Sequence, residues 1–451
     1  MAARFKNIDR RTRLLMPPDL RDWVPEDDMV HFVIEAVEQL PMASFKVNHR
    51  GTGSEQYPPR MMLALLIYCY ASGTFSSRKI EQATYRDVAV RYLTADTHPD
   101  HSTICEFRTS NEEAVAQAFL HVLKLARRMG ILKVGTISVD GTQLKANASK
   151  YKNVSYQRAG QLEEKLKEDI ARLLERAEQA DREDEDDGQR LPQKLSRRQK
   201  LLEKMQQARK ELQQQARRRA ESQKAAYQEK LRRREQREGR RKGPIPKPPR
   251  EEPEPDEQVN LTDPDSRIMR KNKRSEYRQA YNAQAAVDAD GTQMVLAAEV
   301  SNCASDANQL LPAVREVSRT QAKPQAVLAD TGYVNTDALE ELAEAEIEAY
   351  VAVSREESHT ERTYEFRPRK EAKKKKITSP VLLDMKKKLQ SDAGRRMYAK
   401  RKISVEPVFG IIKEVLGFRQ FLLRGMEKVR AEWQLVCLAY NIKRLFGLTR
   451  A

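Results

Sequence analysis

The first 130 residues carry apolar side chains at intervals of three and four, which is the spacing of one face of a helix. Such stripes cover residues 30–40, 77–94 and 110–130, and a strongly apolar helix is expected at 60–71. Two capping-box signatures, Thr103-x-x-Glu106 and Ser110-x-x-Glu113, mark expected helix starts. We therefore expect an all-helical N-terminal domain over residues 1–130. Its helix–turn–helix pattern is compatible with DNA binding, although most helical hairpins do not bind DNA.

After residue 130 the pattern changes to short β-rich runs that alternate with helical stripes. Residues 281–288 and 292–300 predict two strands, because Asp290-Gly291 between them is a strong hairpin signal. Further strands are expected at 135–140, 325–329 and 348–353, with helices at 306–319 and 335–345. This order predicts a mixed α/β sheet with helices packed on it, built from residues 131–154 and 259–451.

Residues 155–258 separate the first strand from the hairpin and are highly charged. Their first apolar stripe has the spacing of a coiled-coil seam and consists of Leu162, Leu166, Ile170, Leu173 and Ala177. A second helix is expected at 195–236, with arginine triplets, before a Pro-rich linker at 243–255. The region therefore predicts an inserted helical hairpin, whose arginines face solvent, a partner helix or DNA phosphates.

The chain has 451 residues, a formal net charge of +17 and a pI of about 9.5. This basic excess indicates nucleic acid or an anionic surface as a partner, although a basic soluble protein without such a partner has the same composition. Four widely spaced cysteines form no Cys-x-x-Cys pair, which argues against a zinc site or a disulfide framework. The apolar run 61–70 is too short to span a membrane, and residues 1–7 lack the apolar core of a signal peptide. We expect a cytoplasmic protein.

Near the C-terminus, Glu406 directly precedes a proline. Because proline suits the first turn of a helix, we expect Glu406 at a helix start. Lys413 follows almost two turns later and shares that face, with Gly410 between them. The opposite, buried face is expected to consist of Val408, Ile411, Ile412 and Val415. Taken alone, this stretch is equally compatible with a surface helix that begins with glutamate.

Two aspartates occupy comparable places, because Asp140 and Asp330 each end a short expected strand. Taken alone, Asp140-Gly141 is more typical of a simple turn. Together with Glu406, however, the aspartates predict three carboxylates at one edge of the sheet. Such a set suits two Mg²⁺ ions about 4 Å apart, or Mn²⁺ in their place, and this arrangement supports phosphoryl transfer.

Several longer motifs contain these residues: Val139-Asp140-Gly141-Thr142, Ala329-Asp330-Thr331-Gly332-Tyr333, and Tyr398-x-x-Arg401 before Val405-Glu406-Pro407-Val408-Phe409-Gly410 and Lys413. Asn282-Ala283-Gln284, Ser305-Asp306-x-x-Gln309-Leu310, His101-Ser102-Thr103 and Phe107-Arg108 accompany them. In this order the set resembles bacterial insertion-sequence transposases of the DDE class. The resemblance covers nearly the whole chain except the arm, and the ordered set is far more specific than any one motif.

The resemblance implies an RNase H-like catalytic core with a mixed sheet, an all-α N-terminal domain and an inserted charged helical or coiled-coil arm. Asp140, Asp330 and Glu406 match the metal-binding catalytic triad. Tyr398, Arg401 and Lys413 match a Tyr-Arg-Glu-Lys signature whose basic members hold phosphates. Four residues separate Arg401 from Glu406, where three are usual, so either Arg401 or Lys402 is the phosphate contact.

Other acidic and basic residues compete with this assignment. Asp288 ends a strand, Asp306 precedes a helix as an expected N-cap, and Asp337 is a third rival carboxylate. The basic segments 367–376 and 386–388 are expected to line a DNA channel or to form a solvated loop. Residues 433–446 are expected to pack in the core, with Cys437 as a buried residue and not a nucleophile.

The resulting interpretation is a DNA transposase that cleaves and transfers strands at the ends of an insertion sequence. Its expected partners are double-stranded DNA, from both the element ends and the target, and a second copy in a synaptic homodimer. We expect it at the bacterial nucleoid. Two alternatives remain open, a catalytically silent DNA-binding repressor derived from a transposase and a stand-alone RNase H-like nuclease. A coiled-coil interaction protein explains only residues 155–240.

Overall fold

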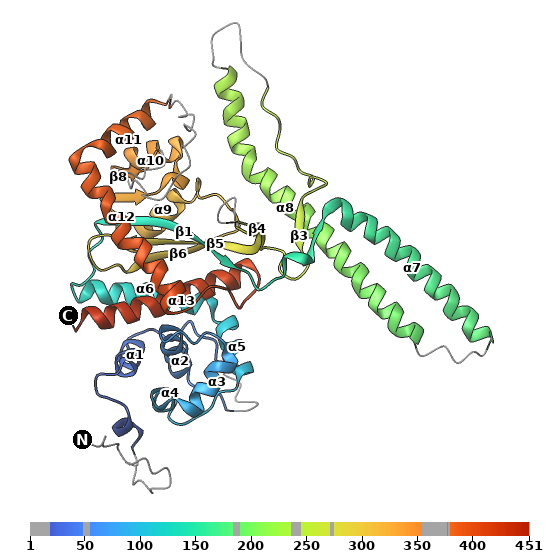
Figure 1. The fold of residues 1–451 in the computed structure, drawn as a ribbon, viewed down its shortest axis with the longest axis horizontal. Helices are drawn as coiled ribbons and strands as arrows, with labels where there is room; N and C mark the ends of the chain where they lie inside the picture. The colour runs from blue at the N-terminus through green and yellow to red at the C-terminus, as the bar shows by residue number, and fades with distance from the viewer. Residues whose placement is uncertain are drawn as a thin grey trace, which may run out of the picture.

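The computed structural model of the chain describes residues 19–47, 55–183, 190–235, 245–270, 275–353, 377 and 379–450. Figure 1 shows a helical N-terminal region, a sheet flanked by helices, and a long helical hairpin that projects away from the sheet. The predicted basic segment 367–376 and the side chain of Ala177 lie outside the described residues.

The N-terminal region consists of short helices around α2, which is buried at every position from Met62 to Ala71. The elements are η1 (Leu20–Trp23), α1 (Met29–Glu38), α2 (Pro59–Ala71), α3 (Ser77–Arg86), α4 (Val88–Leu93), α5 (His101–Ser110) and α6 (Glu112–Arg128). The expected single helix at 77–94 is wrong, because Asp87 is extended and its carboxylate caps α4 by accepting a hydrogen bond from the Val90 amide. The capping boxes are also misplaced: Asp100 caps α5, and α6 begins after Asn111.

A six-stranded mixed sheet forms the middle of the molecule. Its strands are β1 (Thr136–Lys145), β4 (Arg267–Met269), β5 (Arg278–Asp288), β6 (Val295–Ser301), β7 (Ala326–Ala329) and β8 (Glu348–Val351). Strand β1 is central, antiparallel to β5 and parallel to β7, while β8 is parallel to β7. Strands β4 and β6 both pair with the other edge of β5. The mixed sheet and the β5–β6 hairpin expected from the sequence are therefore present.

In the chain, two helices connect strands of the sheet from β6 to β8, and three helices follow β8. They are α9 (Leu310–Thr320), α10 (Thr336–Glu344), α11 (Pro380–Gln390), α12 (Asp392–Gly410) and α13 (Met426–Leu448). Helix α9 contacts β5 and β6, whereas α12 crosses β1, β5, β7 and β8. The single π-helical turn η5 (Ile411–Val415) continues directly from α12.

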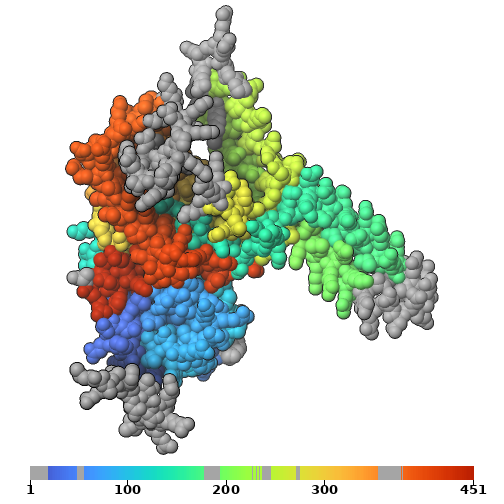
Figure 2. All heavy atoms as spheres, in the orientation of Figure 1, coloured from blue at the N-terminus to red at the C-terminus, as the bar shows by residue number. Residues whose placement is uncertain are grey.

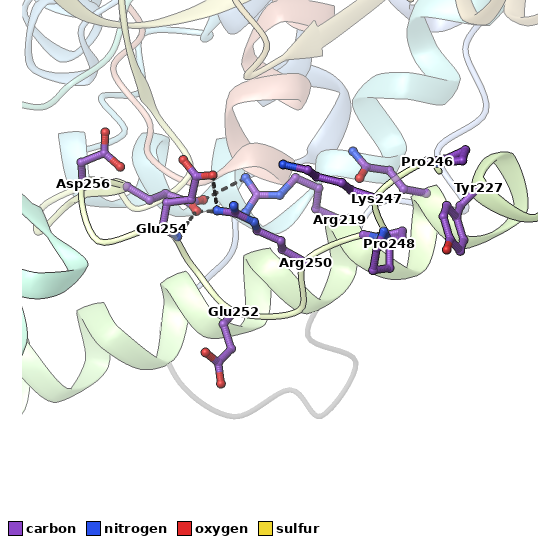
Figure 3. Close-up of a pocket in the computed structure, with 12 residues that line it drawn as sticks. Arg219, Tyr227, Pro246, Lys247, Pro248, Arg250, Glu252, Glu254 and Asp256 are labelled. Atoms are coloured by element: carbon purple, nitrogen blue, oxygen red, sulfur yellow. Dashed lines mark hydrogen bonds and ion pairs between the residues drawn. The ribbon is translucent and has the colours of Figure 1, made fainter. Parts of the chain in front are cut away.

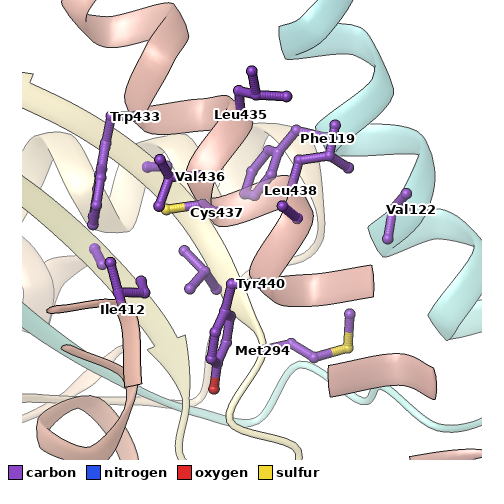
Figure 4. Packing of buried hydrophobic residues seen from close by; sticks show 14 of the residues in the cluster. Phe119, Val122, Met294, Ile412, Trp433, Leu435, Val436, Cys437, Leu438 and Tyr440 are labelled. Atoms are coloured by element: carbon purple, nitrogen blue, oxygen red, sulfur yellow. The ribbon is translucent and has the colours of Figure 1, made fainter. Parts of the chain in front are cut away.

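Helix α13 joins the sheet to the N-terminal helices. It contacts β6 on one side and α2 and α6 on the other. Figure 4 shows Trp433, Cys437 and Leu438 of α13 packed between Phe119 of α6 and the strands. One continuous hydrophobic core therefore includes both regions, and the N-terminal helices do not have a core separate from that of the sheet. Residues 433–446 pack in this core as expected, and Cys437 is fully buried.

The projecting hairpin consists of α7 (Tyr156–Glu183) and α8 (Arg190–Glu235), which pack along each other. Its base is held by β2 (Asn153–Ser155) paired with β3 (Gln258–Asn260). A small apolar cluster of its own stabilises the arm and contains Val154, Ala159, Leu166, Met205, Ala208, Leu212 and Val259. In Figure 2 the arm leaves the body as a narrow limb, which places most of its charged side chains in solvent.

Candidate active site

Asp140 lies in the middle of β1 and not at its end, which corrects the sequence-based expectation. Strand β1 continues to Lys145 because the whole segment from Ile137 pairs with β5. Its pairing with β7 stops at Ser138, so this edge of β1 lacks a partner strand at Asp140. Asp140-Gly141 is therefore no turn. The carboxylate accepts a hydrogen bond from the Gly141 amide at 2.8 Å.

Glycine at position 141 leaves room for polar side chains beside β1. A Cβ atom there would lie 2.3 Å from Nε2 of Gln284 and 2.8 Å from Oδ1 of Asp306. With a larger residue at position 141, the ends of these side chains would have to shift from the positions they occupy. This residue pair, Gly141 opposite Gln284, belongs to the antiparallel register of β1 and β5.

Asp330 directly follows β7, as predicted. The parallel register pairs Ser138 with Leu328, so Asp140 and Asp330 are each two residues beyond the same pair. Oδ1 of Asp330 accepts a hydrogen bond from the Gly332 amide at 2.8 Å and caps the short turn η4 (Thr331–Tyr333). The sheet thus places two carboxylates side by side.

Glu406 lies in the last turn of α12, and the expected helix start at this residue is wrong. Pro407 sits inside α12 and cannot donate to the carbonyl of Ile403. That carbonyl instead accepts a hydrogen bond from Nε2 of Gln293 at 2.7 Å, in the β5–β6 hairpin. The helix therefore continues through the proline, because the hairpin supplies the missing donor.

Arg401 brings the three carboxylates together. Its guanidinium lies 3.0 Å from Oδ2 of Asp140, 2.9 Å from Oε1 of Glu406 and 3.9 Å from Oδ2 of Asp330. The Arg401 side chain is only 11 % exposed. These acidic residues come from three elements that are far apart in the sequence, and they meet at one cation.

Burial and the neighbouring charges shift the pKa values of Asp140 and Arg401. Burial raises the pKa of Asp140 to about 6, with a further increase from Asp330 and an opposing effect from Arg401. Burial lowers the pKa of Arg401, but Asp140, Tyr398, Asp330 and Glu406 outweigh it and keep its pKa above the ordinary value. Arg401 is therefore a permanent positive charge among the carboxylates.

The side chains of the basic candidates lie in different places. Lys402 is exposed on α12, whereas Arg401 turns toward the carboxylates. Lys413 also reaches the site, because its ammonium group donates a hydrogen bond to Thr142, two residues after Asp140. Tyr398 is half-buried on α12 and close enough to Arg401 to raise its pKa.

The π-helical turn η5 after α12 alters which residues of this stretch are buried. Val408 and Ile412 are fully buried, but the side chain of Val415 is 71 % exposed. A π turn holds more residues than an α turn, so it rotates the residues that follow. Three and four-residue spacing alone could not predict this insertion.

The rival carboxylates fall into different environments. Asp288 is buried and accepts hydrogen bonds from the amide and hydroxyl of Thr292, so it stabilises the hairpin turn. Asp337 is exposed in the first turn of α10. Asp306 is not the expected N-cap, because α9 begins only at Leu310, after Gln309.

Asp306 instead joins a polar network beside Gly141 that the sequence-based assignment missed. Asn282 and Gln284 of β5 both donate hydrogen bonds to its Oδ1, and buried Tyr333 donates to Gln284. The available signal was the alternation of Asn282 and Gln284, which places two amides on one face of a strand otherwise rich in alanine.

A separate hollow of about 920 Å³ lies between α8 and the linker that returns from the arm. Two ion pairs lie among its lining side chains, Arg219 with Glu257 and Arg250 with Glu254, and Figure 3 shows the second of them. None of its lining residues belongs to the carboxylate group. The hollow is therefore a feature of the arm and the linker, separate from the carboxylate group.

Two family models match the chain. Residues 18–110 match the family described as Transposase domain (DUF772), and residues 252–442 match the family described as Transposase DDE domain. The chain belongs to the DDE transposases. Searches of the curated proteins and of the solved structures give no match.

Membership in this family makes the chain an enzyme of phosphoryl transfer on DNA. Transposases bind DNA, and DDE transposases generally use divalent metal ions. Among the described residues, no helix has the length and apolar character needed to cross a membrane.

The donor set of the DDE transposase fits such an ion by its chemistry. All three carboxylates present oxygen atoms, which Mg²⁺ and Mn²⁺ prefer. Among the described residues, however, no three side chains of the His, Cys, Asp and Glu types are gathered closely enough to hold a metal ion as they stand. The carboxylates are ion-paired with Arg401 instead, so the guanidinium and a divalent cation would compete for the same oxygens.

Proposed function

We propose that this chain is the transposase of an insertion sequence, which cleaves DNA strands at the element ends and joins them to target DNA. The observation that carries the proposal is the convergence of Asp140, Asp330 and Glu406 on Arg401. In this proposal the three carboxylates hold two divalent cations, Mg²⁺ or Mn²⁺. Bound cations would supply activation of the attacking oxygen and stabilisation of the leaving oxygen.

The sheet supports an RNase H-like core for this reaction. Its strand order is β4–β5–β1–β7–β8, with β6 also paired to β5, and it is antiparallel on the β5 side of β1 and parallel on the β7 side. This order puts Asp140 on β1 and Asp330 directly after the neighbouring strand β7, each two residues beyond the pair of Ser138 and Leu328. The helix that carries Glu406 then crosses these strands and supplies the third carboxylate.

Arg401 and Lys413 hold phosphate in the proposed complex. A guanidinium matches two phosphate oxygens at once, and an ammonium group adds a compact charge. Arg401 competes with the metal for the three carboxylates in the DNA-free protein. When DNA phosphates attract Arg401, this competition is relieved, so the metal is expected to bind without DNA and to bind more tightly with it. The same arginine therefore protects the carboxylates from mutual repulsion before DNA binds.

The other parts of the chain have proposed roles around this centre. Residues 1–130 contact the element ends, the catalytic core comprises 131–154 and 259–451, and the arm at 155–258 contributes to a synaptic homodimer. The retention of all three carboxylates argues against a silent repressor. The N-terminal helices and the arm argue against a stand-alone nuclease, which needs neither.

The proposal is tested with purified protein and a supercoiled plasmid that carries the inverted repeats flanking the reading frame. With Mg²⁺ we expect nicked and linear plasmid with breaks at the repeats, and none with EDTA. Tight binding to the repeats without cleavage supports the repressor instead. Cleavage at sites unrelated to the repeats supports the nuclease.

DNA binding is expected to depend strongly on salt. If six or more phosphates are neutralised, raising the salt from about 50 to about 200 mM weakens binding by about a thousandfold or more, because counterions are released. Fluorescence anisotropy with a labelled element end measures this change. An affinity that stays constant over this range contradicts a DNA-binding surface made of arginine and lysine.

The binding of Mn²⁺ is expected to weaken as the pH falls through about 6. Burial raises the pKa of Asp140 to about 6, so this ligand becomes protonated between pH 7 and 5. Over this interval the apparent affinity falls by about tenfold. The raised pKa also means that the protonated form of Asp140 stabilises the folded state. This stabilisation is fully present below the unfolded pKa and is lost as the pH rises through about 6.

Electron paramagnetic resonance of free Mn²⁺ in DNA-free protein measures the affinity at each pH. Asp337→Asn, which removes an exposed carboxylate outside the site, should follow the wild-type curve. An affinity that is equal at pH 7 and pH 5 contradicts a role for Asp140 as a ligand with this raised pKa.

A further inference from the structure

Asp306 is a fourth carboxylate beside the proposed metal ligands. It lies between β6 and α9 and is half-buried. Its Oδ1 atom accepts hydrogen bonds of 2.7 Å from both Asn282 and Gln284. Its other oxygen, Oδ2, accepts no hydrogen bond from the residues that the structure describes. One oxygen is thus held in place while the other stays available.

The two amides that hold Asp306 are themselves fixed. Gln284 accepts a hydrogen bond from the buried hydroxyl of Tyr333 on its side-chain oxygen, and its carbonyl accepts one from the indole of Trp433 at 2.9 Å. Asn282 also donates to the carbonyl of Cys303 at 3.2 Å. Such supporting hydrogen bonds orient a ligand in the way that metal sites require.

Two glycines bring Asp306 close to the aspartates. Its Oδ1 lies 2.8 Å from the position that a Cβ atom on Gly141 would take, directly after Asp140. Its Oδ2 lies 3.4 Å from the corresponding position on Gly332, which is itself 2.9 Å from Oδ1 of Asp330. The available oxygen of Asp306 therefore faces the side of the site that carries Asp330.

A carboxylate at this place needs a reason beyond the hydrogen bonds. An asparagine would accept from the same two amides with its oxygen and would not repel Asp140 and Asp330. The side chain instead adds a negative charge to a partly buried acidic group, which is unfavourable unless a cation compensates it. Within the part of the chain that the structure describes, Arg401 forms ion pairs with the other three carboxylates and none with Asp306.

We propose that Asp306 is a fourth acidic ligand of the active centre, with Oδ2 contacting a divalent cation directly or through its bound water. Asn282 and Gln284 act as positioning residues that hold Oδ1. The inference rests on the proposed metal-binding role of Asp140, Asp330 and Glu406 and extends it by one residue.

The experiment measures Mn²⁺ binding to the DNA-free full-length protein by electron paramagnetic resonance, in the wild type and three variants. Asp306→Asn keeps the acceptor for both amides and removes the charged oxygen, so folding is expected to be retained. Asp330→Asn is the reference for loss of a ligand, and Asp337→Asn is the matched control for loss of one surface charge. Thermal unfolding without metal checks that each variant is folded.

We expect Asp306→Asn to weaken Mn²⁺ binding by about tenfold or more, and Asp337→Asn to leave it unchanged. Wild-type affinity in Asp306→Asn, together with weak binding in Asp330→Asn, overturns the fourth ligand and leaves the proposed function intact. Equal affinity in all variants, or no binding by the wild type, overturns the metal-binding triad and the fourth ligand together.

Discussion

Strand cleavage by Asp330→Asn or Glu406→Gln falls by about a thousandfold or more relative to the wild type. Each amide keeps the size of the original side chain but carries no negative charge for a divalent cation. Stabilisation of the reacting oxygens by a metal ion contributes several kcal/mol, and about 4 kcal/mol corresponds to a factor of about a thousand. Denaturing gels of end-labelled element DNA with Mg²⁺ measure the rate.

Both substitutions are expected to leave folding and DNA binding intact. The side chains of Asp330 and Glu406 are 40 % and 50 % exposed, and each contacts Arg401 at the edge of the group. Exposed polar substitutions of this kind usually change stability little. Asp337→Asn serves as the control and should cleave at the wild-type rate. Undiminished cleavage by either triad variant contradicts its assignment as a catalytic ligand.

The second large effect concerns stability, at a buried ion pair between the N-terminal helices and α13. Arg108 of α5 lies 4.0 Å from Glu432, and the two side chains are 5 % and 0 % exposed. Arg108 also donates to the hydroxyl of Tyr70 at 2.8 Å. Glu432 accepts hydrogen bonds from two backbone amides before α13. Burial raises the pKa of Glu432, which Arg108 and these amides oppose.

Arg108→Met is expected to lower the free energy of unfolding by about 3–5 kcal/mol, because it leaves Glu432 buried without a cation. Urea-induced unfolding at pH 7 measures the change. The double variant Arg108→Met/Glu432→Gln should recover part of the loss, since the unpaired charge is gone. Arg91→Met breaks the more exposed Arg91–Asp96 pair and should lower the free energy of unfolding far less than Arg108→Met does. An Arg108→Met midpoint equal to the wild type contradicts a stabilising ion pair.

Sequence motifs indicated the residues of the first prediction but not those of the second. The carboxylates were candidates because each follows or accompanies a recognisable motif. The Arg108–Glu432 pair was not, because 323 positions separate its members and neither residue has a neighbour that marks it. Phe107-Arg108 contributed only to the family resemblance. A long-range ion pair depends on the packing of α13 against α5, which no local pattern encodes.

Local sequence patterns predicted a helix or strand correctly where residues close in the sequence determine it. The Asp290-Gly291 turn predicted the β5–β6 hairpin, amphipathic stripes predicted α1 and α6, and a continuous apolar run predicted α2. They failed where a side chain from another element changed the outcome. Gln293 replaces the donor that Pro407 lacks, so α12 extends beyond Glu406. Pairing with β5 extends β1 through Asp140-Gly141, where the dipeptide alone indicates a turn.

By itself the sequence determined the mixed sheet, the helical N-terminal region and the candidates Asp140, Asp330 and Glu406, because these follow from local periodicity and short motifs. Only the tertiary structure decided that Arg401, and not Lys402, meets the carboxylates, since this depends on how α12 is rotated over the sheet. It also placed Asp306 beside them, through two amides on β5. Distances across the fold depend on strand register and helix packing, and neither is set by residues adjacent in the chain.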